Sequence, residues 1–244
     1  DLASIRTKAV QVDGGWEVNG AKLWTSNAHR ADMMILFART SRDEDDRRGG
    51  VSQFLVDMKS PGITVRAVKN LLGEHDFNEV IFDSLFIPDN MVIGTIGNGW
   101  RQVTSELAYE RSSPDRYLTP FNLVRGLADR LQTDGNDLQI EAFGRLISQV
   151  WVLQSMSLSV AGMLHQGEHP DAEAAIVKDL GTQLEQEIPE TVRKLVPLSD
   201  RVANPDDPFN TLLERVIGWS PAYTIRGGTR EILRGIIARG LGLR

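Results

Sequence analysis

The sequence changes its periodicity once, near residue 95, and this change limits the chain to folds in which a β-rich part precedes a helical part. Before it, β-branched and aromatic residues gather between turn residues at 16–24, 33–38, 51–57, 63–68 and 79–87. From Trp100 onward, apolar residues recur at helical spacing. We therefore expect an α+β chain of two domains: an antiparallel β-barrel or sandwich over residues 1–95 and an antiparallel four-helix bundle over residues 96–244.

Local patterns refine this expectation. Asn19-Gly20 is a strong hairpin signal, and the continuous apolar residues 33–38 are typical of a strand buried on both faces. The helical part predicts helices around Trp100 to Glu110, around 143–158, over 172–195 with an interruption at Pro189, and after 227–229. The charged run at 42–48 is typical of a solvated loop.

The composition excludes several classes of function. The chain of 244 residues has no cysteine, which rules out disulfides, a thiolate nucleophile and cysteine-ligated metals. Its net charge of −6 disfavours nucleic-acid binding, and its four histidines give no metal-binding spacing. The longest apolar run, residues 33–38, is too short to span a membrane, and no leader is visible, so we expect a cytoplasmic protein.

Glu110 is the strongest candidate for chemistry. It continues the helical stripe of Trp100, Val103 and Leu107, so its carboxylate is expected to point into the bundle. A carboxylate in apolar surroundings has a raised proton affinity and suits a general base or acid. The alternative is a structural ion pair with a basic residue from another helix.

Two segments have features of ligand-binding backbone. Trp24-Thr25-Ser26-Asn27 ends a predicted strand with an indole and two hydroxyls, which can stack on and hydrogen-bond a planar heterocycle, or can simply form a turn. The segment 227–231 (Gly-Gly-Thr-Arg-Glu) opens the last helix, where free N–H groups suit anionic oxygens, although Thr229 is also an ordinary N-cap residue. The glycines at 94, 97 and 99 do not form a dinucleotide-binding motif.

Taken in order, these segments resemble the flavin-dependent acyl-CoA dehydrogenases over essentially the whole chain. The resemblance rests on residues 19–28 (NGAKLWTSNA), Ile87-Pro88, the junction 94–100, Tyr109-Glu110-Arg111, residues 228–232 (GTREI) and the tail 236–243. It implies that the first part is the family's middle β domain and the second its C-terminal helical domain. It also implies that the N-terminal helical domain is missing and that Asp1 ends a Gly-Ser-Asp motif.

The resemblance further implies an FAD-dependent α,β-desaturation of an acyl-CoA thioester, with a glutamate base and hydride transfer to the flavin N5 atom. It places the cofactor contacts at Trp24, Thr25, Ser26, Gly228, Thr229 and Glu231. Many members carry the base directly before the Gly-Thr of the C-terminal motif, a position that is Gly227 here. The isovaleryl-like and long-chain branches place it on the first helix after the β domain, where Glu110 matches.

Two family segments have no counterpart in this sequence. The Arg-x-x-Phe-Gly segment has no clear match at 130–145, and Gln-x-x-Gly-Gly is absent between Leu195 and Gly228. This pattern resembles a bacterial subgroup that includes hetero-oligomeric enzymes. The alternatives are therefore a catalytic dehydrogenase chain, a non-catalytic partner subunit of a hetero-oligomeric dehydrogenase, or an acyl-CoA oxidase. For the catalytic chain the resemblance implies a homo- or hetero-oligomer that passes electrons to an electron-transferring flavoprotein.

Overall fold

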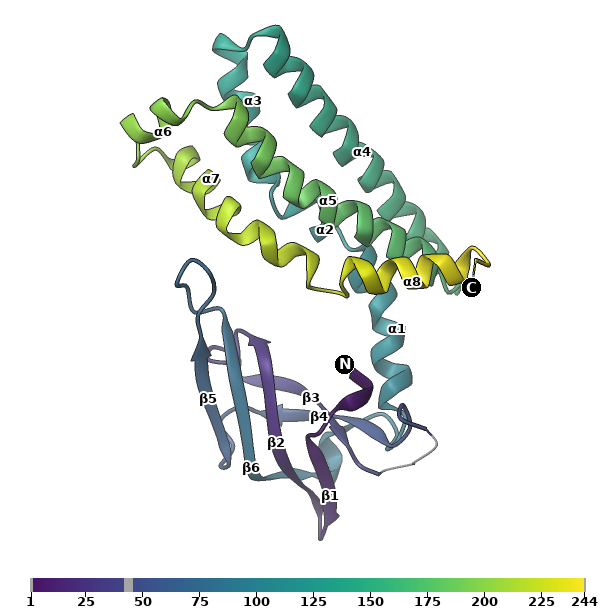
Figure 1. Ribbon diagram of the computed structural model, residues 1–244. Helices are drawn as coiled ribbons and strands as arrows, with labels where there is room; N and C mark the ends of the chain where they lie inside the picture. The colour runs from purple at the N-terminus through teal and green to yellow at the C-terminus, as the bar shows by residue number, and fades with distance from the viewer. Residues whose placement is uncertain (1, 42–45, 244) are drawn as a thin grey trace. The chain divides into compact units, whose positions relative to one another are not determined.

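The computed structural model describes residues 2–41 and 46–243, with only the backbone described at 133 and 134. The chain forms two compact units, Asp1–Ser105 and Glu106–Arg244 (Figure 1), and each is described by itself below. The α+β class expected from the sequence is confirmed, since the strands all lie in the first unit and most helices in the second. Residues 42–45 of the charged run lie outside the described residues.

The first unit is built on one seven-stranded sheet, ordered β5-β6-β2-β1-β3-β4-β7. Its strands are β1 (Lys8–Val12), β2 (Gly15–Ser26), β3 (Met33–Arg39), β4 (Val51–Asp57), β5 (Ile63–Val68), β6 (Phe77–Pro88) and β7 (Val92–Ile93). Two short 3-10 helices, η1 (Leu2–Ser4) and η2 (Asp89–Met91), accompany them. The long antiparallel pair of β2 and β6 forms the middle of the sheet.

The sheet is mixed, whereas the sequence predicted purely antiparallel strands. β1 pairs antiparallel with β2 along its length, but it meets β3 in parallel at the pair Lys8 and Arg39. The reason is that β2 has β1 on one side and β6 on the other. The next strand, β3, therefore pairs with the outer side of β1 and runs in the same direction.

Asn19-Gly20 does not form the predicted hairpin turn. Both residues lie inside β2, at an irregularity in its pairing with β6, and the chain turns instead between β1 and β2 at Asp13-Gly14. Gly20 has a φ of +143°, and a Cβ there would lie 2.7 Å from the Cα of Thr7. Gly20 therefore belongs to a β-bulge, in which two stretches of backbone approach closely. Bulges and turns both favour glycine, so the local sequence is the same for either.

The predicted strand 33–38 exists as β3, but it is not buried on both faces. Leu36 and Ala38 are buried, while Met33 and Ile35 are exposed within the described structure. The inward residues of β3 join Trp16, Phe54 and other residues in the core of the first unit.

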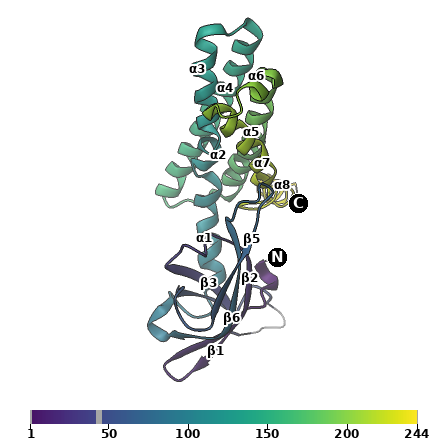
Figure 2. The same ribbon diagram turned by 90° about the vertical axis from the view of Figure 1, so that its left-hand side faces the viewer.

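The second unit is helical and begins within α1. Its helices are α1 (Gly99–Ser112), α2 (Asp115–Leu118), α3 (Phe121–Asp134), α4 (Asp137–His165), α5 (Asp171–Leu195), α6 (Leu198–Ala203), α7 (Pro208–Trp219) and α8 (Arg230–Gly240), with a 3-10 turn η3 (Ser220–Thr224). The helices α3, α4 and α5 run side by side (Figures 1 and 2). The sequence analysis did not predict α3 or α7.

Local sequence explains where these helices begin. Asn136 accepts a hydrogen bond from the backbone N–H of Gln139, and the Gln139 side chain accepts one from the backbone N–H of Asn136, which forms a capping box before α4. Asp207 caps α7 in front of Pro208, a residue suited to a first helical position. α5 continues through Pro189, so the predicted interruption is wrong. Pro189 and Ile188 are buried, and this packing offsets the loss of one backbone hydrogen bond.

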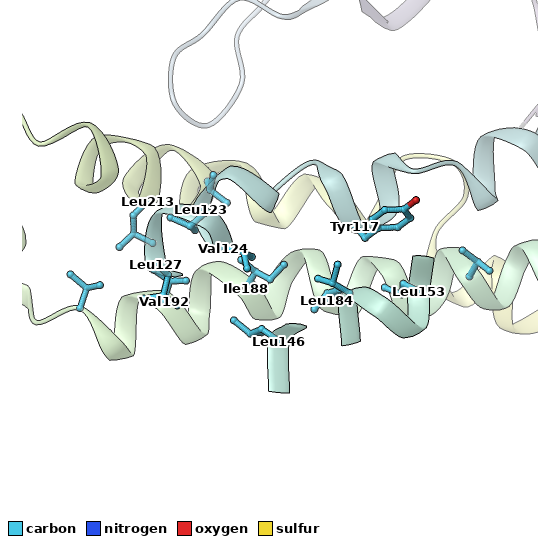
Figure 3. Packing of buried hydrophobic residues seen from close by; sticks show 14 of the residues in the cluster. Tyr117, Leu123, Val124, Leu127, Leu146, Leu153, Leu184, Ile188, Val192 and Leu213 are labelled. Carbon is cyan, nitrogen blue, oxygen red and sulfur yellow. The ribbon is translucent and has the colours of Figure 1, made fainter. Parts of the chain in front are cut away.

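The helical core consists mainly of aliphatic side chains from α3, α4, α5 and α7, with Tyr117 of α2 among them (Figure 3). Ile188 and Leu213 lie fully buried within it. Because the core joins residues far apart in sequence, it fixes α2 and the segment after α7 against α5.

By length and composition alone, α4 is apolar enough to cross a membrane. In the described structure, 28% of its most apolar window is buried. Its apolar residues lie on two faces. Leu146, Val150 and Leu153 enter the core, while Trp151 and Leu158 are exposed. The packing against α3 and α5 accounts for the buried part of this hydropathy.

Candidate functional site

Glu110 lies in the last turn of α1, and its side chain is 44% exposed. The inward residues at this end of the helix are Ala108, Arg111 and Ser112 rather than the predicted stripe. The surroundings of the carboxylate are also charged rather than apolar, since Nη2 of Arg116 lies 3.9 Å from Oε1 of Glu110. The carboxylate accepts no hydrogen bond from the residues that the structure describes.

Gly227 lies directly against this carboxylate. A Cβ atom at position 227 would be 2.6 Å from Oε2 and 2.7 Å from Oε1 of Glu110. Gly227 also has a φ of +66°, in the left-handed region that glycine adopts without strain. Glu110 and Gly227, which are 117 positions apart in the sequence, therefore meet within the second unit.

Arg111 ties the two segments together. Its Nε donates a hydrogen bond to the carbonyl oxygen of Gly227 over 3.3 Å, and its guanidinium is buried. Burial lowers the pKa of Arg111, while the nearby carboxylate of Glu110 opposes this shift. A Cβ atom at Gly228 would lie 3.9 Å from Nη2 of Arg111, so this cation also lies beside the glycine pair.

Next to Glu110 lies a group of charged side chains, which we name the charged cluster: the buried Arg116, Lys178 and Glu185 and the partly exposed Arg226. Glu185 is fully buried and forms an ion pair with Arg226. Burial raises the pKa of Glu185, and the cations of Arg226 and Arg116 oppose that shift. Burial also lowers the pKa of Lys178 to about 8, and Nζ of this lysine donates to Thr182 and to the carbonyl of Tyr223.

The predicted anion site at the start of α8 has an open backbone. Thr229 occupies the N-cap position, but its side chain makes no capping hydrogen bond to the backbone. Glu231 lies in the first turn, where its own backbone N–H and the Thr229 hydroxyl lower the pKa of its carboxyl. The nearest atom to a Cβ at Gly228 would be 3.6 Å away, on Leu233, so the backbone there is accessible.

The other predicted segment ends β2 in the first unit. Trp24 is 61% exposed and has a φ of +61°, an unusual conformation for a bulky residue. Its indole contacts Phe77 edge-on, with the ring centroids 5.7 Å apart. Thr25 and Ser26 follow it at the end of the strand, where Thr25 is partly buried and Ser26 is exposed.

This strand end is held from behind by a buried asparagine. Asn78 donates to the carbonyl of Thr25 over 3.0 Å and also contacts His29 and His75. The two imidazoles are stacked, with centroids 3.8 Å apart. Desolvation is the main cause that lowers the pKa of His29, and the adjacent His75 adds to it.

The sequence analysis did not predict the charged cluster, although a pattern for it exists. Lys178, Thr182 and Glu185 recur at helical spacing on the face of α5 that also carries Val177 and Ile188. Polar residues inside an apolar stripe indicate a buried polar group. The partners, Arg116 and Arg226, had no pattern of their own.

Comparison with known proteins identifies the family. The acyl-CoA dehydrogenase middle domain matches residues 1–85, and the acyl-CoA dehydrogenase C-terminal domain matches residues 128–242. The chain belongs to the acyl-CoA dehydrogenase family, as the resemblance implied.

Individual relatives agree with this assignment. The chain is 36% identical to "Acyl-CoA dehydrogenase FadE34" of Mycobacterium tuberculosis over its whole length, but it spans only 33% of that protein. Among solved structures, the "Tcur3481-Tcur3483 steroid ACAD G363A variant" matches with a TM-score of 0.89 and 23% identity, covering all of this chain and 66% of that one. The ChsE4-ChsE5 complex of M. tuberculosis matches with a TM-score of 0.82 and 25% identity, again over all of this chain and 66% of that one.

Proposed function

We propose that this chain is the catalytic part of an acyl-CoA dehydrogenase in which Glu110 removes the α-proton of an acyl-CoA thioester. The proposed activity is that of the complete protein, because relatives such as FadE34 contain further segments besides the part that this chain matches. It includes a flavin as cofactor and a cytoplasmic location.

The observation that supports it best is the overlap between Glu110 and Gly227. Family members carry the base either on the first helix after the β domain or directly before the C-terminal Gly-Thr. Here the carboxylate oxygens of Glu110 lie within 2.7 Å of where a side chain at 227 would begin. The two base positions therefore converge on one location, and only one of them holds an acid.

The geometry of Glu110 suits proton abstraction. The carboxylate is half-exposed and accepts no hydrogen bond from the described residues, so its lone pairs are free to accept a proton. As the α C–H bond breaks, its electron pair forms the Cα–Cβ double bond, and the β-hydrogen leaves as hydride. A bound flavin would supply the hydride acceptor.

The residues proposed to hold the flavin fit such a group. The exposed Trp24 indole and the hydroxyls of Thr25 and Ser26 suit a planar heterocycle with polar edges. In the second unit, the accessible backbone of Gly228 and the Arg111 cation beside it suit an anionic pyrophosphate. We include Thr229 and Glu231 because they adjoin this backbone at the start of α8.

The test is Glu110→Gln in the complete, flavin-loaded protein. This change keeps the size of the side chain and removes its basicity. We expect bleaching of the flavin by acyl-CoA to slow by about 10²–10⁴-fold, the usual contribution of a general base. Glu106→Gln is the matched control, since Glu106 is an exposed carboxylate one helical turn earlier. Flavin reduction at the parent rate in Glu110→Gln would falsify the proposal.

The partners follow from the same proposal. We propose an oligomer, either of identical chains or with a second dehydrogenase-like chain, because a relative of known structure is the two-component ChsE4-ChsE5 complex. We propose an electron-transferring flavoprotein as the electron acceptor. Hydrogen peroxide formed in proportion to turnover would instead identify an acyl-CoA oxidase, and a complete protein that purifies without flavin would favour a non-catalytic subunit.

A further inference from the structure

Arg116 is buried beside the proposed base by a specific arrangement of two helices. It lies on the short helix α2, and its side chain is only 2% exposed. α5 provides the space for it, because a Cβ at Gly181 would lie 2.7 Å from the Cβ of Arg116. The helix thus has a glycine where the arginine side chain packs.

The charged cluster contains more cations than carboxylates, since Arg116, Lys178 and Arg226 surround Glu185, the carboxylate that most favours the charge of Arg116. Glu185 is already paired with Arg226, which also donates to the Thr119 hydroxyl. Lys178 adds a further buried amine near the same carboxylate. Glu110 is the second carboxylate within reach of Arg116, at 3.9 Å.

Stability alone does not explain an arginine at this place. Nε and Nη1 of Arg116 are buried and have no hydrogen-bond partner among the described residues. Buried donors without partners destabilise a fold, and an apolar side chain of similar size is often better tolerated there. A buried cation with two unpaired donors therefore indicates a role beyond stability.

We infer that Arg116 is a positioning residue that holds the carboxylate of Glu110 in place without hydrogen-bonding it. The inference rests on the proposed role of Glu110. At 3.9 Å the guanidinium attracts the carboxylate but is too distant for a hydrogen bond, so the oxygens stay free for the substrate proton. The other charged groups around Glu110 are Arg111 and Glu106 on its own helix and Lys178 on α5, and none of them lies within ion-pair distance of it among the described residues.

A comparison of kcat with KM tests this inference. In Arg116→Met we expect the rate of flavin reduction at saturating acyl-CoA to fall by about 10-fold, because the base is held less well in place. Arg116→Lys, which keeps a cation, should restore most of the parent rate, and KM should change little in either variant. Arg145→Met, which removes an exposed ion pair with Glu141, is the matched control.

A second measurement is independent of turnover. Infrared spectroscopy of the substrate-free, flavin-loaded protein can identify the carboxylate band that disappears in Glu110→Gln, and this band should broaden or shift in Arg116→Met because the carboxylate is held less firmly. Arg116→Gln replaces Arg116→Met in both measurements if the latter does not fold. A parent rate of flavin reduction and an unchanged carboxylate band in Arg116→Met would overturn the role of Arg116 while leaving Glu110 as the base. Failure of Glu110 itself appears separately, as an unchanged rate in Glu110→Gln.

Discussion

Replacing Gly227 by alanine tests whether the space beside Glu110 matters for catalysis. The new Cβ would lie 2.6 Å from Oε2 of Glu110, whereas ordinary van der Waals contact begins at 3.4 Å. The carboxylate must therefore move by about 0.8 Å, the difference between these two distances. A misplacement of about 1 Å in a reacting group can reduce a rate by about 10²-fold, which is the loss we expect.

The same substitution also strains the backbone, and this effect must be separated from the displacement. Alanine at a φ of +66° costs roughly 1–2 kcal/mol. Gly167→Ala is the matched control, because Gly167 has a φ of +80° but no atom lies within 4 Å of its Cβ position. The two variants should lose similar stability, and only Gly227→Ala should lose activity.

The assay combines thermal unfolding with stopped-flow bleaching of the flavin by acyl-CoA, on the complete protein. Comparable melting temperatures in the two variants show that strain is matched. If Gly227→Ala then reduces its flavin at the rate of Gly167→Ala, the carboxylate beside position 227 does not take part in the reaction, and the reasoning is refuted.

Three further predictions follow from the same structure. Glu110→Ala combined with Gly227→Glu should recover measurable flavin reduction that Glu110→Ala alone lacks, because the new acid starts beside the vacated carboxylate position; no recovery would contradict the convergence of the two base positions. Lys178→Met should stabilise the protein at pH 7, because burial lowers the pKa of the lysine to about 8 from its ordinary 10.5 and the folded state holds the charged amine at a cost. Because unfolded chains keep that proton up to about pH 10.5, the parent regains stability between pH 8 and 10.5. The difference in free energy of unfolding between parent and variant should therefore shrink over that range, from at most about 3 kcal/mol, as measured by chemical denaturation at each pH. Trp24→Gly should weaken flavin retention while leaving the stability of the flavin-free protein within about 1 kcal/mol, since relief of the φ of +61° offsets the lost edge contact with Phe77.

The sequence was sufficient for the α+β class because periodicity reports burial directly, whereas pairing details depend on contacts that no local pattern encodes. Asn19-Gly20 illustrates the difference. The pair has the composition of a turn, but the close approach of Thr7 makes Gly20 part of a bulge within a longer strand. Pro189 is similar, since its helix continues where burial outweighs the local preference of proline.

The candidate site was only partly predictable for the same reason. Glu110 and the segment that begins at Gly227 were each predicted as candidate site residues. The sequence did not show that these two parts of the chain lie next to each other in the fold. The apolar surroundings expected for Glu110 were wrong, because α1 turns Arg111 inward and α2 supplies Arg116. Both residues are buried arginines, which a hydrophobicity pattern assigns to the surface.

The ion pair of Glu110 was the alternative to a catalytic role, and the charged cluster itself argues against that alternative. Glu185 has the features of a structural carboxylate, since it is fully buried and hydrogen-bonded to Arg226. Glu110 has the opposite features in the same group of cations: it is half-exposed, and its contact with Arg116 at 3.9 Å includes no hydrogen bond. A long pair with one exposed partner adds little to stability. Because Glu185 already serves the structural role, the open carboxylate of Glu110 is the one that remains free to accept a proton.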